Sequence, residues 1–180
     1  LVMAGAILEL YKQGYRNFIF FVNTDTIIRK TKENFLNPKS SKYLFKEQIN
    51  IDGVNVKITS VDNFESTNKE DINILFSTIQ GLHSKLNAPR ENSITFDDFI
   101  EKETVLISDE AHHINALTKK KHSAGEKENI KSWEHTVERI LSTNPNNIMM
   151  EFTATLELSH PAVASKYANK LLYNYPLAKF

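Results

Sequence analysis

Two adjacent carboxylates follow a short apolar run at residues 104–108, where the sequence continues Asp109-Glu110-Ala111-His112-His113. Such a pair at the end of a buried strand is costly unless a cation lies close to it. Magnesium suits this position, because it binds one or two carboxylates together with waters and substrate phosphates. We therefore expect Asp109 to bind magnesium and Glu110 to orient and deprotonate an attacking water. His112 would sense the phosphate or relay to another domain.

Asp109 and Glu110 have two alternative interpretations, a helix cap and a transition-metal site. Carboxylates also cap helices, and an isolated Asp-Glu pair is most often a cap. The combination of an apolar run before the pair and Ala-His-His after it is much rarer, and it favours the magnesium site. A transition-metal site would use His112, His113 and His122 with Asp109, but adjacent histidines do not easily point the same way. We expect the other histidines at the surface: His83, His135 and His160.

The segments that must position these residues alternate between apolar runs and helical patterns. Continuous apolar runs are typical of strands buried on both faces of a parallel sheet. Strands alternating with helices predict a doubly wound, mostly parallel α/β sheet with helices on both faces. The expected strands are residues 17–22, 72–76, 104–108 and 148–152, and the expected helices are 1–13, 26–35, 132–141 and 162–172.

Three further segments have local signals. Asp52-Gly53 separates two alternating runs within residues 47–61, and the second run includes Val54, Val56 and Ile58, which predicts a β-hairpin insertion. Thr95 is expected to cap a short helix. Residues 119–128 are polar and charged and predict a mobile loop, in which three lysines are solvated rather than bound to phosphate. Trp133 is expected in the core rather than stacked on a base.

Polar residues follow each of the expected strands. In parallel sheets, ligands bind outside the carboxyl ends of the strands, so these residues predict one active-site rim. Local capping is the alternative interpretation for the pairs after the first and last strands. The rim residues are Asn23 and Thr24, Ser77 and Thr78, Asp109 and Glu110, and Thr153 and Thr155.

Composition excludes several classes of protein. The chain has 180 residues, which is enough for one domain with a proper core. It has no cysteine, so disulfide scaffolds and thiolate metal sites are excluded. Its formal net charge is zero, which gives no overall basic footprint for nucleic acid. There is no apolar run long enough for a membrane span and no basic leader, so a cytoplasmic protein without membrane contact is expected.

These motifs resemble those of DEAH-type superfamily 2 helicases, in which the first motor domain is RecA-like. Asp109-Glu110-Ala111-His112 resembles their Walker B motif, and Phe152-Thr153-Ala154-Thr155 resembles their Ser/Thr-Ala-Thr motif. Residues 20–24 and 74–82 resemble the segments that carry motifs Ia and Ib. More narrowly, residues 107–116, Ser132-Trp133-Glu134 and residues 151–155 resemble the restriction (Res) subunit of type III restriction-modification enzymes. The resemblance extends over essentially the whole chain.

The resemblance implies roles for the rim. ATP and Mg²⁺ would be the cofactors, with Asp109 as the magnesium ligand, Glu110 as the residue that activates water, and His112 as the link to a second motor domain. Thr153 and Thr155 would contact the nucleotide site and couple its state to movement. Asn23, Thr24 and Thr78 would touch the nucleic-acid backbone. Double-stranded DNA and the methyltransferase (Mod) subunit would be the partners, and the parent enzyme would cleave DNA.

One family motif is missing from these residues. No Gly-x-x-x-x-Gly-Lys-Ser/Thr can be written in the sequence, although in the family this phosphate-binding loop ends just before a helix like residues 1–13. We therefore expect residues 1–180 to be a single RecA-like helicase domain truncated after that loop and inert alone. Two alternatives remain: a non-catalytic interaction scaffold with a motor-like fold, or a metal-dependent hydrolase built on Asp109, Glu110 and His112.

Overall fold

Five parallel strands form the central sheet in a computed structural model, which describes residues 1–65, 67–109, 124–154 and 158–174. The strand order is β4-β5-β1-β6-β7 within the described residues, and every neighbouring pair is parallel. The doubly wound parallel sheet predicted from the sequence is confirmed. The strands are β1 (Asn17–Val22), β4 (Ile58–Val61), β5 (Ile72–Thr78), β6 (Thr104–Asp109) and β7 (Ile148–Phe152).

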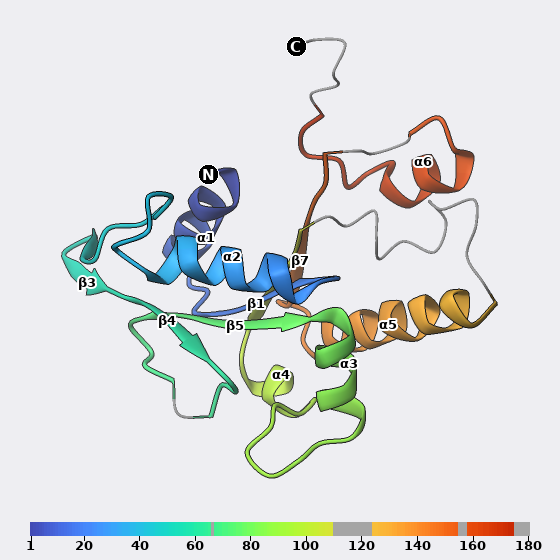
Figure 1. The fold of residues 1–180 in the computed structure, drawn as a ribbon, viewed down its shortest axis with the longest axis horizontal. Coiled ribbons are helices and arrows are strands. Elements are labelled where there is room, and N and C mark those ends of the chain that lie inside the picture. Colours follow the sequence, from blue (N-terminus) through green and yellow to red (C-terminus); the bar gives the residue numbers. More distant parts are fainter. Residues whose placement is uncertain (66, 110–123, 155–157, 175–180) are drawn as a thin grey trace.

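Strand β1 explains why the sheet has helices on both faces. All six of its residues are buried, and their side chains alternate between two apolar clusters. Phe18 and Phe20 pack toward α1 (Val2–Lys12) and α2 (Asp25–Leu36). Ile19 and Phe21 pack on the opposite face, toward α3 (Ile79–Asn87), α4 (Asp98–Glu101) and α5 (Ala124–Thr143). Figure 1 shows these two helical layers on either side of the strands.

Helix α1 follows its prediction closely. Its buried residues are Ala4, Ile7, Leu10 and Tyr11, which is the spacing of one helical face. The helix ends before Gly14, which has a φ of 109°. Gly14 N–H donates to the Tyr11 carbonyl and Tyr15 N–H donates to the Leu10 carbonyl, at 3.0 and 3.1 Å. These two bonds complete a glycine-based C-cap of the kind expected at this position.

The hairpin prediction is confirmed in its first part and wrong in its second. Strands β2 (Ile49–Ile51) and β3 (Val54–Val56) pair antiparallel around Asp52 and Gly53, whose φ angles of 50° and 86° suit a tight hairpin turn. Ile58, however, belongs to β4, which leaves the hairpin and joins the central sheet beside β5. The division falls at Lys57, because its N–H donates to Asp71 Oδ1 at 3.0 Å and its carbonyl accepts from Ile72 N–H at 2.8 Å.

Helices α3 and α4, which lie on the same face of the sheet, were not predicted as they occur in the structure. Helix α3 was not predicted, although Thr78 caps it and Ile79, Leu82 and Leu86 give it a buried face. Helix α4 begins at Asp98 rather than with a Thr95 cap. A capping Thr95 would accept a hydrogen bond from a backbone N–H of the helix. Instead the Thr95 N–H donates to the Asp98 carboxylate at 2.8 Å.

Helices α5 and α6 (Pro161–Tyr167) have different bounds from those predicted. Helix α5 begins at Ala124, so residues 124–128 are helical and not part of a loop; Glu and Lys, which fill much of this stretch, favour helix. The other expected loop residues, 119–123, lie outside the described residues. Helix α6 ends at Tyr167 instead of continuing to 172. Leu171 and Leu172 are 42% and 89% exposed, so a longer helix would bury little apolar surface there.

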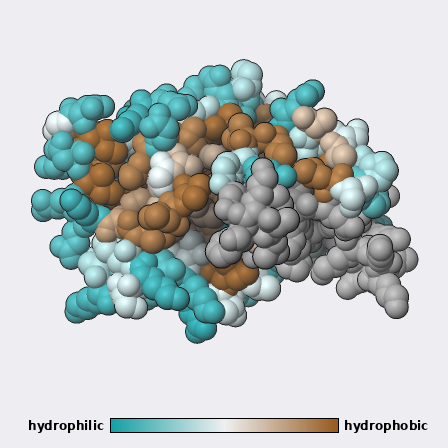
Figure 2. Space-filling model, turned by 90° about the horizontal axis from the view of Figure 1, so that it is seen from above, coloured by the Kyte–Doolittle hydropathy of each residue, from teal (hydrophilic) through white to brown (hydrophobic). Residues whose placement is uncertain are grey.

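Apolar surface is also visible outside the core. Exposed apolar side chains occur at the start of α1 and after α6, including Leu1, Val2 and Leu172. Seen from the side of α1 and α2, the surface has apolar areas between hydrophilic ones (Figure 2). No helix among the described residues is long and apolar enough to span a lipid bilayer.

Candidate functional site

Four of the predicted rim residues lie at one edge of the sheet. Thr78 and Asp109 are the last residues of β5 and β6, and Asn23 and Thr153 directly follow β1 and β7. All of these strands are parallel, so their carboxyl ends share one edge. Strands β5 and β7 are three positions apart in the sheet, which corresponds to about 14 Å between their ends. Glu110, His112 and Thr155 lie outside the described residues, so their positions stay predictions.

The strand register places these ends level with one another. Val22 pairs with Thr78, and Asp109 pairs with Phe152. One residue earlier, Phe21 pairs with both Ser77 and Ser108. The rim therefore begins at the same height on four neighbouring strands, which brings residues that are far apart in the sequence to one edge of the sheet.

Asp109 is the point at which β6 leaves the core. The five preceding residues of the strand are buried, and Asp109 is half-buried. Ser108 is fully buried, and its hydroxyl has no hydrogen-bond partner among the described residues. The carboxylate thus stands at the boundary between an apolar interior and the rim, where a nearby cation stabilises its charged form.

Thr78 has a structural role at the rim. Its Oγ1 accepts a hydrogen bond from the Gly81 N–H at 3.1 Å and so caps α3. A threonine hydroxyl that accepts one bond still has its own proton to donate. Capping is therefore compatible with the predicted contact between Thr78 and a nucleic-acid phosphate.

The side-chain contacts of Asn23 and Thr24 do not support the alternative interpretation that this pair caps the following helix. Thr24 is the N-cap residue of α2, but its side chain makes no capping bond and is exposed. Asn23 Oδ1 accepts from Gln80 Nε2 at 2.9 Å, which joins the end of β1 to the first turn of α3. The Asn23 bond therefore holds the end of β1 against the start of α3 at the rim, while Thr24 is exposed to solvent.

Gly81 is a rim residue that the sequence analysis did not single out. A Cβ at this position would lie 2.9 Å from Ser77 Oγ and 3.1 Å from Thr78 Oγ1. Glycine therefore allows α3 to start directly against the end of β5. The Thr-x-x-Gly spacing after an apolar strand is the signal that could have identified it.

The described rim residues include oxygen donors of the kind that magnesium binds. Among the described residues, no group of three or more His, Cys, Asp or Glu side chains could hold a metal ion. Magnesium needs only one or two protein carboxylates, because phosphates and water complete its octahedral shell. Asp109 provides such an oxygen donor, with the Thr153 hydroxyl at the end of the next strand. The histidine alternative falls on residues 112, 113 and 122, which lie outside the described residues.

A parallel sheet of this order, with helices on both faces and a polar rim at its carboxyl edge, defines a RecA-like α/β domain of the helicase type. The family model described as "Type III restriction enzyme, res subunit" matches residues 1–158. The chain belongs to this family of Res subunits, as the motifs at residues 107–116 and 151–155 predicted.

A curated relative supports the same assignment. The chain is 38% identical over 197 aligned residues to the "Probable type III restriction-modification enzyme HindVIP Res subunit" of Haemophilus influenzae. The alignment covers 100% of this chain and 38% of the relative. The chain thus spans well under half the length of that protein.

Proposed function

We propose that this chain forms part of the ATP-dependent DNA translocase or helicase motor of a type III restriction endonuclease subunit, as a single RecA-like motor domain. The observation that carries the proposal is the alignment of parallel strand ends at one edge of the sheet, where Thr78 ends β5, Asp109 ends β6 and Thr153 follows β7 by one residue. Membership of the Res family supports the same motor role.

The nucleotide side of the rim is centred on β6. Asp109 would supply a carboxylate oxygen to magnesium, which would neutralise phosphate charge when bound. Glu110 would accept the proton of the attacking water, and its carboxylate is the group that general-base chemistry requires. His112 would connect this site to another motor domain. Thr153 and Thr155 would exchange hydrogen-bond partners when a phosphate leaves, because hydroxyls both donate and accept.

The nucleic-acid side of the rim is formed by β1 and β5. Asn23, Thr24 and Thr78 would contact backbone phosphates of duplex DNA, and uncharged side chains of these types are common phosphate ligands. The formal net charge of zero agrees with weak binding by this part alone. In the parent enzyme, the Mod subunit would be the second partner.

The proposal is tested with Glu110→Gln in a complete Res subunit that carries this sequence. The change preserves shape and removes the proton acceptor, so ATP binding should persist while hydrolysis falls by about 10² to 10⁴ fold. Asp109→Asn is the matched variant, and it should instead weaken magnesium-dependent nucleotide binding. Normal hydrolysis by both variants would show that the acidic strand end is only a helix cap.

A further inference from the structure

Helix α5 contacts both α3 and α6 through residues that lie within about one helical turn of one another. The contacts come from the segment Ser132-Trp133-Glu134, here called the Ser-Trp-Glu segment, and from Thr136 one turn after Ser132. Trp133 is partly buried against the apolar cluster on the face of the sheet that α3 and α4 cover, as expected for a core residue. This packing fixes the rotation of α5 and so determines where the residues on either side of Trp133 point.

The contact with α3 is made through His83, which was expected at the surface and is half-buried in the structure. His83 Nδ1 lies 2.7 Å from Thr136 Oγ1, and its Nε2 lies 3.4 Å from Ser132 Oγ. Thr136 is only 3% exposed. Asn87, one turn further along α3, donates to the His83 carbonyl at 2.8 Å. Both ring nitrogens of His83 thus face hydroxyls of α5.

Several polar groups surround the His83 ring at this contact. Thr136 Oγ1 lies 2.7 Å from Nδ1, Asn87 Nδ2 lies 3.1 Å from the same nitrogen, and Ser132 Oγ lies 3.4 Å from Nε2. The Thr136 hydroxyl also donates to the Ser132 carbonyl at 3.1 Å within α5. The imidazole is therefore held through both of its ring nitrogens between α3 and α5.

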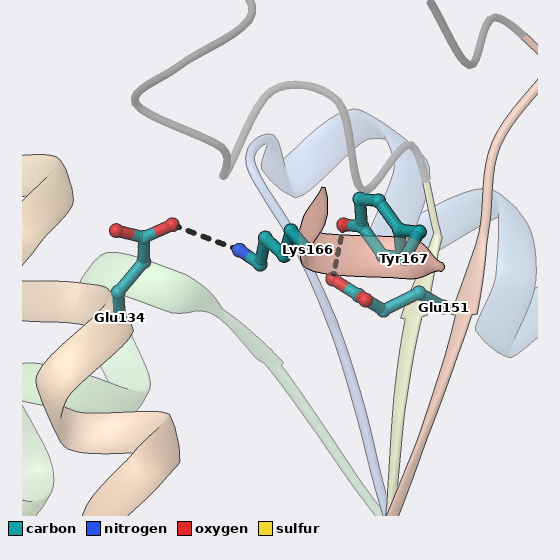
Figure 3. A network of polar contacts seen from close by, with 4 residues as sticks. All are labelled: Glu134, Glu151, Lys166 and Tyr167. Carbon is teal, nitrogen blue, oxygen red and sulfur yellow. Dashed lines mark hydrogen bonds and ion pairs between the residues drawn. The ribbon is translucent and has the colours of Figure 1, made fainter. Parts of the chain in front are cut away.

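The contact with α6 lies on the other side of the Ser-Trp-Glu segment. Glu134 Oε1 lies 3.1 Å from Lys166 Nζ of α6, and the two side chains are 28% and 35% exposed. The next residue, Tyr167, donates from its hydroxyl to Glu151 Oε1 of β7 at 3.2 Å. Figure 3 shows this series of contacts running from α5 through α6 to β7.

The geometry of a helix explains why these contacts diverge. Residues two apart on an α-helix are separated by about 200° around its axis, so Ser132 and Glu134 point to opposite sides. One side reaches α3, whose N-cap is Thr78. The other side reaches α6, which follows the Thr153 segment. Helix α5 itself follows β6 and the acidic motif in the chain.

We infer that the Ser-Trp-Glu segment couples the predicted DNA contact at Thr78 to the end of β7, which Thr153 follows, with His83 and Lys166 as the positioning residues on either side. This inference rests on the proposed motor function. A displacement of α3 would be passed through His83 to α5, because a packed helix moves as a rigid element. The ion pair between Glu134 and Lys166 would then pass it to α6 and the end of β7.

The test measures ATP turnover by a complete Res subunit with and without duplex DNA. Glu134→Lys and Lys166→Glu should each lower the ratio of DNA-stimulated to DNA-free turnover by about fivefold, a typical coupling effect. DNA-free turnover should stay within about twofold of wild type. The double variant Glu134→Lys with Lys166→Glu should restore the ratio, because the ion pair is rebuilt in reverse. His135→Ala is the matched control, since His135 is exposed on the same helix.

A second pair of variants separates coupling from simple structural support. His83→Ala and Glu134→Gln should each lower the ratio, and their combination should lower it no further than the stronger single change, because both interrupt one path. Unchanged ratios, a failed charge exchange, or additive losses in the combined variant would overturn the inference. A proportional loss of both turnover rates would do the same.

Failure of the proposed function is recognised separately. A wild-type subunit whose ATP turnover does not respond to DNA overturns the motor proposal. Hydrogen exchange then still tests the coupling: His83→Ala should speed amide exchange in α6, on the opposite side of α5, as well as in α3. Faster exchange confined to α3 would overturn the inference.

Discussion

The two edges of the sheet use the same kinds of polar residue for different purposes. At the amino edge, Asn147 is 7% exposed, and its side chain accepts from the Thr104 N–H at 2.8 Å and donates to the carbonyls of Phe99 and Ile140. At the carboxyl edge, Asn23 is half-exposed and accepts from Gln80. The difference teaches that a polar residue beside a strand is a weaker sign of function where buried backbone groups already use its whole hydrogen-bonding capacity, as they do at Asn147.

Arg16 extends this contrast at the amino edge. Its guanidinium donates to the carbonyls of Lys69 and Tyr11 and lies 3.8 Å from the centre of the Tyr11 ring. The Tyr11 hydroxyl in turn donates to the Glu70 carbonyl at 2.7 Å. These contacts close the amino edge with bonds inside the protein. The carboxyl edge instead presents a carboxylate and hydroxyls at the ends of level strands, which is where the motor proposal places its ligands.

The largest expected effect is on ATP turnover and concerns only the carboxyl edge of the sheet. The isolated chain should show no ATP turnover, because its 180 residues contain no phosphate-binding loop to cradle the phosphates beside Asp109. Phosphate release should be measured with and without duplex DNA, and the complete Res subunit serves as the positive control. DNA-stimulated turnover by the purified chain would show that the rim needs no such loop.

A large effect on stability is expected at the amino edge. Asn147→Ala should lower the free energy of unfolding by about 2 kcal/mol, because it leaves the Thr104 N–H buried without its side-chain acceptor and removes one donor from the carbonyls of Phe99 and Ile140. Urea denaturation of the chain measures this. Asn146→Ala, at the neighbouring exposed position, is the control and should change stability by less than about 1 kcal/mol. Equal effects of the two changes would contradict the structural assignment of Asn147.

An intermediate effect is expected for Thr153→Ala with Thr155→Ala in the complete Res subunit. If these hydroxyls couple the nucleotide to movement, ATP hydrolysis should remain largely intact while DNA translocation falls by about tenfold, or about 1.4 kcal/mol. Triplex displacement and phosphate release should be followed on the same preparation. Equal loss of both activities, or loss of neither, would favour local capping of the following turn.

The smallest effect compares two glycines. Gly81→Ala should lower the free energy of unfolding by about 1 kcal/mol, because the new Cβ would crowd Ser77 Oγ at 2.9 Å and the capping hydroxyl of Thr78. Gly5→Ala is the matched control in α1, where nothing lies within 4 Å of a new Cβ. It should raise stability by about 0.5 to 1 kcal/mol, since alanine favours helix. Urea denaturation should therefore give changes of opposite sign in the free energy of unfolding for the two variants. A stabilising effect of Gly81→Ala would refute the close packing of α3 against the end of β5.

Local patterns in the sequence were enough to predict most strands and the rim. The apolar runs of β1, β6 and β7 matched the observed strands almost residue for residue. A strand buried on both faces leaves a continuous apolar signal, and the polar residue that ends it is visible in the sequence itself. The level arrangement of these ends followed once the sheet was parallel.

Only the tertiary structure decided which long-range hydrogen bonds residues such as Lys57, His83 and Asn147 make. Residues 54–58 read as one alternating run, but the bonds from Lys57 to Asp71 and Ile72 divide it between two sheets. His83 read as a surface residue until α5 packed against α3 and brought Thr136 to its ring. Asn147 bonds to Thr104, which lies 43 residues away, and no local pattern around Asn147 indicates that contact. Such contacts join distant parts of the chain, and short-range periodicity carries no information about them.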